Sequence, residues 1–551
     1  MALSIITTTP LSLICLYGAG SGVLSHVAYF IRGEHHRQAP SLLIITITAP
    51  LLAITTQLFF TDVGFTAALV RSFAALGSFL GALWVSMVTY RLFFHPLRHF
   101  PGPFGAKVSK FWHVKQVFPK LQNHRLLASL QKEYGDFVRT GPNQISVFSP
   151  AGVQAIQGVR SKCTKNAWYD MSLPTISLQQ VRDKNVHDKR RRIWDHGFAA
   201  GSLRVYEDRI MAHASTLLSQ LRAQGGNVTS ATKWFQLFGF DVMTDIAFGR
   251  SFDMTKTGKA HPGLELMEKA MKPIGLLSHI PWLFMLLGYI PGLANDHLKF
   301  LSWSGDQVMQ RVKMDKEIQE RDVMSWLVEA YNKSPQKEAD RLLLQGDARL
   351  IIVAGSDTTS STLTYAAYEL ATNPEIVKAL REELSTLGKT MSSISLKDLQ
   401  SCDYLNAVIS ETLRLHPPVP SGVMRKTPPE GITVGTTFIP GNTTVVSPTY
   451  VVSRSSDAYE LADKFLPERW TSRPGLVKDK SAYAPFSLGV YSCIGKQLAL
   501  MELRIVLFML VTEFDICFAP GDDGSSFLDN DLDAFTIVIA DLKLAFIPRE
   551  K

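Results

Sequence analysis

Apolar residues are concentrated in the first hundred positions of this chain, in three stretches separated by short polar segments. The stretches cover about residues 3–31, 41–60 and 72–94. The second and third each have roughly the 20 residues that a helix needs to cross a bilayer. The first is interrupted by Pro10, and a signal peptide or an interfacial segment is its alternative, although it lacks a basic start and a clear cleavage site. The pattern predicts a transmembrane anchor over residues 1–94, and three helices are favoured over two.

Positive charges follow the first and third stretches. Arg32 and Arg37 come after the first stretch, and Arg98 and Lys107 come after the third. The segment after the second stretch carries Arg71 only at its far end. Because cytosolic loops are enriched in lysine and arginine, three spans place everything that follows the anchor in the cytosol.

A proline-rich segment, residues 95–110, follows the anchor and contains Pro96, Pro101 and Pro103. Proline fixes the backbone φ angle and ends helices. We therefore expect a stiff hinge between the anchor and a domain of residues 111–551.

Helical periodicity dominates this domain, and short strand patterns interrupt it. Hairpins are predicted at residues 137–148, turning at 141–143, and at 432–446, turning at 440–442. A third β region is expected at 535–547. The predicted fold class is mainly α with small β-sheets, and nothing in the pattern indicates a parallel α/β sheet.

Composition narrows the classes of function. The chain has 551 residues and a net charge of +8, which suits an anionic membrane surface or an acidic protein partner. A nucleic-acid partner is the least supported explanation of the positive net charge, because the sequence has no basic tail and no zinc-finger spacing. The five cysteines include no C-x-x-C pair, so zinc-site and thioredoxin-like readings fail. The glycine-rich run at residues 18–22 lacks the third glycine position of a dinucleotide fingerprint and follows no strand.

The strongest local signal is Cys493, which lies seven residues after Phe486 and just before a helical pattern that starts at Lys496. A cysteine that binds haem iron needs a tight loop whose backbone N–H groups reach the sulfur. Gly489 and Gly495 permit unusual dihedral angles and a close approach of the backbone to a porphyrin. The dipole of the following helix favours the thiolate. The alternative is a buried cysteine before a helix.

A second signal lies inside a long helical pattern, where Ala354-Gly355-Ser356-Asp357-Thr358-Thr359 replaces good helix formers. Asp357 and Thr358 form an acid–alcohol pair that can hold a water and relay protons. Gly355 is expected to leave room for a small ligand beside the helix. A helix with a polar patch is the alternative.

A third signal is a set of charges. Glu411 and Arg414 share a helical face at i and i+3, and Arg469 follows in Pro467-Glu468-Arg469-Trp470. We expect a buried structural network of these three side chains. An exposed ion pair on a helix is the alternative.

In their order along the chain, at residues 354–359, 411–414 and 486–495, the three motifs resemble those of the cytochrome P450 family over about residues 95–551. The membrane anchor and the proline-rich hinge resemble those of microsomal members. The multi-span anchor and the tyrosine before the cysteine resemble members from fungal specialised metabolism. The resemblance implies a P450 fold after the anchor, a haem b bound axially by Cys493, and Phe486 packed near the thiolate. It also implies proton relay by Asp357 and Thr358, and a core network of Glu411, Arg414 and Arg469.

The resemblance has two departures. The family usually carries arginine or histidine two residues before the cysteine, to bind a haem propionate, but Tyr491 stands there in this chain. The family's W-x-x-x-R pattern places Arg191 at the arginine and His187 at the tryptophan. Arg191 is the first candidate for a propionate partner, and Arg425 is the second. Arg190 and Arg192 are expected at the surface.

The implied activity is a monooxygenase that oxidises a lipophilic small molecule, such as a polyketide, terpenoid or alkaloid intermediate. The enzyme would use O2 and electrons from an NADPH–cytochrome P450 reductase, and it would act at the endoplasmic reticulum membrane. Lys496 and some of Lys189, Arg190 and Arg192 are candidates for docking that reductase. A haem-thiolate isomerase or dehydratase that needs no O2, and a membrane haem sensor, are the alternatives. Substrate-facing residues are expected at 166–181, 350–354, 419–423 and around Phe535.

Overall fold

The structure is a computed structural model, and it describes residues 9–290, 292–314, 320–387 and 395–550. The chain divides into two compact units, and each is described here by itself. The first unit comprises Met1–His113, Arg139–Asn143 and Leu277–Ala294. The second comprises Val114–Val138, Gln144–Leu276 and Asn295–Lys551.

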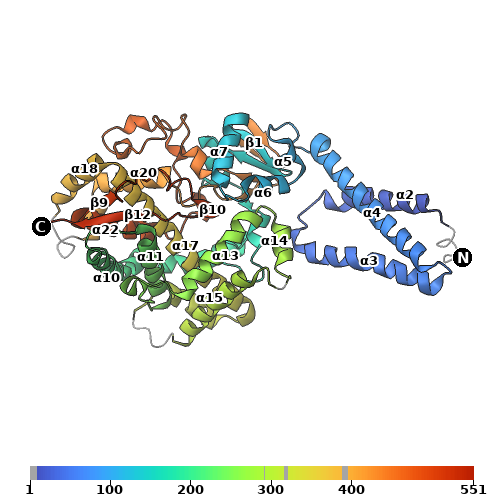
Figure 1. The fold of residues 1–551 in the computed structure, drawn as a ribbon, viewed down its shortest axis with the longest axis horizontal. Helices are drawn as coiled ribbons and strands as arrows, with labels where there is room; N and C mark the ends of the chain where they lie inside the picture. The colour runs from blue at the N-terminus through green and yellow to red at the C-terminus, as the bar shows by residue number, and fades with distance from the viewer. Residues whose placement is uncertain (1–8, 291, 315–319, 388–394, 551) are drawn as a thin grey trace. The chain divides into compact units, whose positions relative to one another are not determined.

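The first unit is built on three long apolar helices, α2, α3 and α4 (Figure 1). Helix α2 (Leu11–Ser25) continues into a π-helical turn at His26–Phe30, and α4 (Phe65–Thr89) continues into another at Tyr90–Phe94. Helix α3 (Ala39–Phe60) lies between them in sequence. Each is long and apolar enough to cross a membrane, which confirms the three predicted apolar helices.

The third helix begins earlier than the apolar stretch suggested. Helix α4 starts at Phe65, so Arg71 lies inside it and not in a loop. Arg71 Nη2 donates to the carbonyl oxygen of Thr9 at 2.7 Å. The apolar pattern missed this first part because Arg71 interrupts it.

Helices α2 and α4 pack closely through small residues. A Cβ atom added to Gly18 would lie 2.6 Å from the carbonyl oxygen of Ala75, and one added to Gly22 would overlap the carbonyl oxygen of Phe79. Small residues four positions apart let the backbones of two helices approach in this way. The glycine-rich run is therefore a helix-packing surface.

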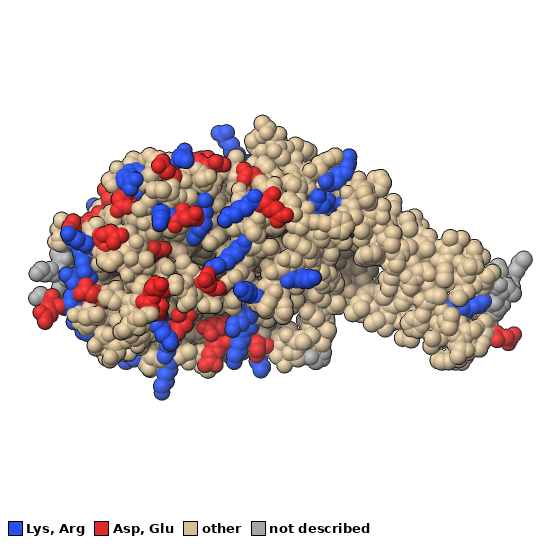
Figure 2. Space-filling model, turned by 45° about the horizontal axis from the view of Figure 1, so that its top comes forward, with Lys and Arg blue, Asp and Glu red and all other residues tan. Residues whose placement is uncertain are grey.

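Short elements complete the first unit. They include α5 (Phe104–Val108), the start of α6 (Phe111–Val117) and α14 (Pro281–Leu287). Much of the expected hinge is thus irregular, and α5 begins directly after Pro103. Lysine, arginine, aspartate and glutamate are spread over the visible face of the second unit, whereas the three long helices show few of them (Figure 2).

The second unit is mainly helical with small sheets, as the sequence predicts. Its helices are α7 (Asn123–Tyr134), α8 (Pro150–Gln157), α9 (Lys184–Gly197), α10 (Ala200–Ala223), α11 (Ala231–Phe248), α12 (Met254–Thr257), α13 (Pro262–Leu277), α15 (Asn295–Lys313), α16 (Val323–Lys333), α17 (Lys337–Thr372), α18 (Pro374–Ser385), α19 (Leu396–Gln400), α20 (Asp403–Leu415), α21 (Thr449–Val452) and α22 (Lys496–Glu513). Helix α17 packs along α11, which is buried along nearly its whole length, and also contacts α22 (Figure 1). These helices form the core that carries the site.

The strands belong to small sheets. They are β1 (Phe137–Gly141), β2 (Gln144–Val147), β3 (Thr164–Lys165), β4 (Val228–Ser230), β5 (Arg425–Lys426), β6 (Ile432–Val434), β7 (Thr437–Ile439), β8 (Thr444–Val446), β9 (Phe514–Phe518), β10 (Leu532–Ala534), β11 (Thr536–Val538) and β12 (Lys543–Pro548). In the largest sheet β8 pairs in parallel with β2 and antiparallel with β5, and β5 pairs antiparallel with β3. Strand β12 joins β4 and β9.

The predicted hairpin at residues 432–446 is wrong in its turn. Strands β6 and β7 pair with each other through a turn that contains Gly435, whose φ is +59°. Glycine adopts such an angle without strain, so the chain reverses there. The turn at residues 440–442 instead leads the chain into β8 of another sheet.

Candidate active site

A cavity of about 300 Å³ lies within the second unit. Its walls come from α9, α17, the start of α22, the β10–β11 hairpin and the loop that carries Cys493. Apolar side chains predominate, and each segment expected to face a substrate contributes to the wall. Those contributors are Tyr169, Leu178, Gln179, Leu350, Ile351, Ala354, Val419, Gly422, Val423 and Phe535. A mostly apolar cavity with a few polar groups is typical of a small-molecule site.

Cys493 lies in the cavity wall between a 3₁₀ turn at Gly489–Tyr491 and the first residue of α22. The Cys493 N–H donates to the carbonyl oxygen of Phe486 at 2.8 Å, which closes the loop. Burial raises the pKa of the thiol, while the backbone N–H of Gly495, the charge of Arg191 and the N–H of Lys496 act in the opposite direction. The loop thus offers a sulfur with backbone donors at the start of a helix, which suits a metal-bound thiolate.

The three glycines of the motifs differ in what they do. Gly489 has φ +65°, and an added Cβ would lie 2.8 Å from the carbonyl oxygen of Gln157, so this position requires glycine. Gly495 has an ordinary φ of −78°. Gly355 lines the cavity, and the Met243 side chain occupies the space that a Cβ at this position would take.

Asp357 and Thr358 lie on different faces of α17. Thr358 lines the cavity, and its Oγ1 donates to the carbonyl oxygen of Ala354 at 2.7 Å. The carboxylate of Asp357 accepts instead from Thr536 Oγ1 of β11 at 3.4 Å. Burial raises the pKa of Asp357 to about 7, and the charge of Glu268 contributes in the same direction. The carboxyl can therefore exchange a proton near neutral pH.

Both candidate propionate partners lie in the cavity wall. Arg191 Nη1 donates to the carbonyl oxygen of Ser492 at 2.8 Å, beside Cys493. Arg425 is buried, and its Nη1 donates to the hydroxyl of Tyr169 at 2.6 Å. The guanidinium carbon of Arg425 lies 5.0 Å from the ring centre of Tyr491. One end of the cavity therefore carries positive charge.

The expectation that Arg190 lies at the surface is wrong. Arg190 is buried, and its Nε donates to Asp347 Oδ2 at 2.6 Å. The indole N–H of Trp194 donates to the same oxygen at 3.1 Å. Lys189 and Arg192, in contrast, are exposed. Arg190 is turned inward because α9 presents its 187, 190 and 194 positions to the core, so it is unavailable for docking a protein.

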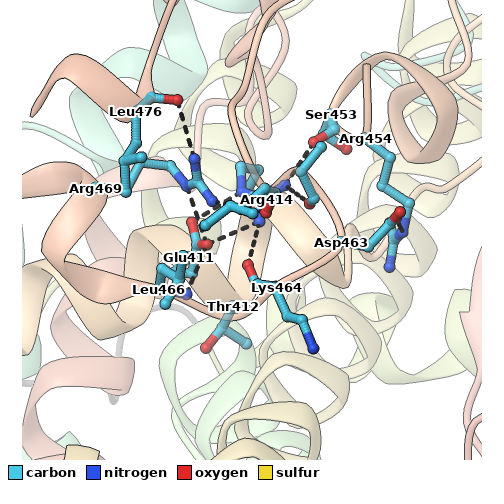
Figure 3. A network of polar contacts seen from close by, with 12 residues as sticks. Glu411, Thr412, Arg414, Ser453, Arg454, Asp463, Lys464, Leu466, Arg469 and Leu476 are labelled. Carbon is cyan, nitrogen blue, oxygen red and sulfur yellow. Dashed lines mark hydrogen bonds and ion pairs between the residues drawn. The ribbon is translucent and has the colours of Figure 1, made fainter. Parts of the chain in front are cut away.

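The charge network is centred on Glu411 (Figure 3). Its two carboxylate oxygens accept from Nε and Nη2 of Arg414, both at 2.8 Å, and from Arg469 Nε at 3.2 Å. The indole N–H of Trp470 adds a bond at 2.9 Å. The two guanidinium groups also donate to backbone carbonyls, which belong to Ser453, Glu460, Leu461, Ala462, Lys464 and Leu476.

This network ties α20 to the irregular segment of residues 453–476. The side chains of Glu411, Arg414 and Arg469 are completely buried. Because backbone carbonyls and one carboxylate satisfy the arginines, the network fixes the path of a segment that has little regular structure of its own.

Lys165 belongs to the site but was not singled out in the sequence, whereas Tyr169, Phe535 and Thr536 lie in or beside segments that were expected to face a substrate. Lys165 and Tyr169 face the charged end of the cavity, and Thr536 contacts Asp357. Phe535 has φ +82° and stacks on Trp168 with ring centres 4.6 Å apart. None follows a local spacing rule. The sequence indicated Tyr169 and Phe535 only through the segments that contain them, and it gave no signal for Lys165.

Comparisons with known proteins agree with this geometry. The family model described as cytochrome P450 matches residues 101–545. The chain is 40% identical over 534 residues to cytochrome P450 monooxygenase FCK2 of Fusarium pseudograminearum, which covers 96% of each chain. It is 41% identical over 469 residues to cytochrome P450 monooxygenase orf5 of Eupenicillium brefeldianum, with 85% and 95% covered. It is 40% identical over 518 residues to tryprostatin B 6-hydroxylase of Aspergillus fumigatus, with 92% and 91% covered.

Proposed function

The chain belongs to the cytochrome P450 family and is a monooxygenase, and we propose that it oxidises a lipophilic intermediate of fungal secondary metabolism with electrons from an NADPH–cytochrome P450 reductase. Membership of the family implies a haem-thiolate iron, O2, a small-molecule substrate and a redox partner. The observation that carries the proposal is Cys493 in the wall of an apolar cavity that Thr358 also lines.

The residues around the cavity suit haem b. Cys493 presents its sulfur beside backbone N–H donors, and Phe486 lines the same loop. Arg191 and Arg425 supply positive charge for the two propionates. When bound, the haem-thiolate iron supplies the activation of O2, and electron donation from the sulfur favours O–O cleavage. The chain itself supplies the sulfur, the apolar walls that exclude water and the groups that move protons.

Proton delivery is assigned to Asp357 and Thr358. Asp357 is half-buried, and desolvation raises its pKa to about 7, so its carboxyl can hold or release a proton at neutral pH. Thr358 places a hydroxyl at the cavity wall one residue later. Because the two side chains lie on different faces of α17, water is needed to pass protons from the carboxyl to the hydroxyl and the cavity.

The apolar walls favour a lipophilic substrate. A polyketide, terpenoid or alkaloid intermediate has that character, and one relative is named as a hydroxylase of tryprostatin B. The long apolar helices support a multi-pass anchor, which we assign to the endoplasmic reticulum with the catalytic domain in the cytosol. Lys189, Arg192 and Lys496 are exposed and would attract the acidic surface of a reductase.

The central test is a reduced-minus-CO difference spectrum of the purified full-length protein, with Cys493→His as the control. The red-shifted thiolate band should appear in the natural protein and should be lost in the variant. A band at the position of histidine-ligated haem in the natural protein would refute the assignment of Cys493.

Activity is then measured with reductase, NADPH and O2 on a panel of lipophilic metabolites. Incorporation of ¹⁸O from labelled O2 into a product supports the monooxygenase. Conversion without O2 or NADPH would instead indicate the isomerase or dehydratase, and haem binding without conversion of any substrate would favour the sensor.

A further inference from the structure

Two cations approach the ring of Tyr491, the residue that stands where the family usually has arginine or histidine. Lys165 Nζ lies 4.8 Å from the ring centre, and the guanidinium carbon of Arg425 lies 5.0 Å from it. Lys165 belongs to β3 and Arg425 to β5, and the two residues are direct cross-strand partners. Like charges placed directly opposite each other in a sheet are destabilising, so this pair needs a reason to exist.

Lys165 is held in place and keeps a free donor. It is 3% exposed, and its Nζ donates to the carbonyl oxygens of Leu178 and Val181, each at 3.0 Å. An ammonium group has three N–H donors, so one remains after these two bonds. Lys165 lines the cavity, and the remaining donor is available to an acceptor there.

Neither cation has a carboxylate partner in the described part of the chain. No aspartate or glutamate oxygen among the described residues lies within 4.0 Å of Lys165 or Arg425. Arg191 adds a third positive charge to the same cavity wall, and its partner Asp195 is half-exposed. Burial and the charges of Arg425 and Arg191 lower the pKa of Lys165 to about 6, so at neutral pH its ammonium form is favoured only when an anion lies beside it. Buried charge of one sign is costly unless an anion accompanies it.

We propose that Lys165 is a haem-positioning residue that supplies, from β3, the positive charge that Tyr491 does not supply from the haem loop. It binds a haem propionate together with Arg425, while Arg191 stands beside Cys493. The two carboxylates of haem b are the anions that this end of the cavity lacks. Tyr491 remains as an aromatic ring near both cations and can donate one hydrogen bond. This inference rests on the proposed binding of haem by Cys493.

A purely structural role for Lys165 makes different predictions. In that case its two carbonyl bonds fasten the segment of residues 178–181, and its loss would loosen that segment whatever stands at position 491. A role in binding haem carboxylates predicts instead that a cation restored at position 491 compensates for the loss of Lys165. The two roles are thus separable by a double variant.

The first measurement compares Lys165→Met with Lys165→Arg and with Lys162→Met in the haem-loaded full-length protein. Lys162 is a matched control, because its side chain is 75% exposed and pairs only with Glu430 at the surface. We expect transfer of haem to apomyoglobin to be roughly 10- to 100-fold faster in Lys165→Met, since a charge-assisted hydrogen bond contributes about 1.5–3 kcal/mol. Lys165→Arg should keep most of the natural rate, and Lys162→Met should keep all of it.

The midpoint potential gives a second readout that does not depend on activity. A nearby cation stabilises the reduced haem, so Lys165→Met should lower the potential. The decisive variant is Lys165→Met combined with Tyr491→Arg, which returns the charge to its usual place. Haem retention and potential should then recover towards the natural values.

The outcomes are distinct. Haem loss from Lys165→Met at the rate of Lys162→Met would overturn the inference. So would faster loss that Tyr491→Arg fails to compensate, because it would indicate the structural role. A natural protein that binds no haem, or shows no thiolate band, would instead refute the proposed function on which the inference rests.

Discussion

The Glu411 network gives the sharpest test of the fold, through the substitution Glu411→Gln. Glutamine keeps the shape of the side chain but removes its charge. Arg414 and Arg469 would then face a neutral amide while both remain completely buried. The amide nitrogen also replaces one of the two acceptor oxygens, so it would oppose N–H groups of Arg414 or Trp470.

The expected cost follows from the loss of one partner in a buried ion pair, which is about 3–5 kcal/mol. Unfolding entropy near 60 °C is roughly 2.1 cal/mol/K per residue, and over residues 101–545 this amounts to about 0.9 kcal/mol/K. Division of the two quantities predicts that Tm falls by roughly 3–5 °C. The backbone of residues 453–476 should also exchange its amide hydrogens faster, because the arginines hold its carbonyl groups.

Thermal unfolding is monitored by far-UV circular dichroism, with all variants in one detergent and Glu468→Gln as the matched control. Glu468 lies next to Arg469, is only partly buried, and accepts from the Tyr404 hydroxyl at 2.7 Å. Its substitution should shift Tm by less than about 1 °C, as is typical of partly exposed positions. Equal shifts in the two variants would refute the view that Glu411 compensates two buried cations.

Three further predictions concern the site. Burial raises the pKa of Asp357 to about 7, so folding favours its protonated form. The contribution of the protonated carboxyl to the free energy of unfolding, and its ability to donate a proton, are both lost as pH rises through about 7. Asp357→Asn should therefore remove that limb from the pH profile of product formation and lower turnover on the order of 10²-fold; an unchanged limb would contradict the role. Gly489→Ala forces a side chain into φ +65°, and the strained angle alone should lower the free energy of unfolding by about 1–2 kcal/mol. Tm and haem content should both fall, and full haem occupancy at unchanged Tm would count against this role of Gly489. Arg192→Gln should weaken the reductase interaction at low salt only. Arg190→Gln should lower Tm, because it leaves Asp347 buried without its arginine partner. The opposite pattern would reverse the two assignments.

Much of the site could be predicted because its motifs are local. Cys493 and Gly489 lie on one loop, Asp357 and Thr358 are adjacent, and Glu411 and Arg414 are one helical turn apart. Short spacings of this kind are visible in a sequence without knowledge of tertiary contacts. The three apolar helices were predictable for a similar reason, since their length and apolarity are properties of continuous segments.

The rest depends on contacts between distant segments. Lys165 and Arg425 meet only because β3 pairs with β5, and Thr536 reaches Asp357 from a hairpin near the C-terminus. The inward direction of Arg190 depends on Asp347 of another helix. A sequence pattern carries no information on such pairs. The hairpin error at residues 432–446 has a similar origin, because two turns compete there and strand pairing decides between them.

The glycine contact between α2 and α4 bears on how the protein can be shortened for biochemical work. Membrane enzymes are often trimmed at their first hydrophobic segment to make them easier to purify. In this chain that cut would bare the backbone of α4 at Ala75 and Phe79 and would deprive Ser86 of its 2.8 Å bond to His26. The remaining α3 and α4 would stay apolar enough for a membrane. Helices α2, α3 and α4 are therefore best kept or removed together.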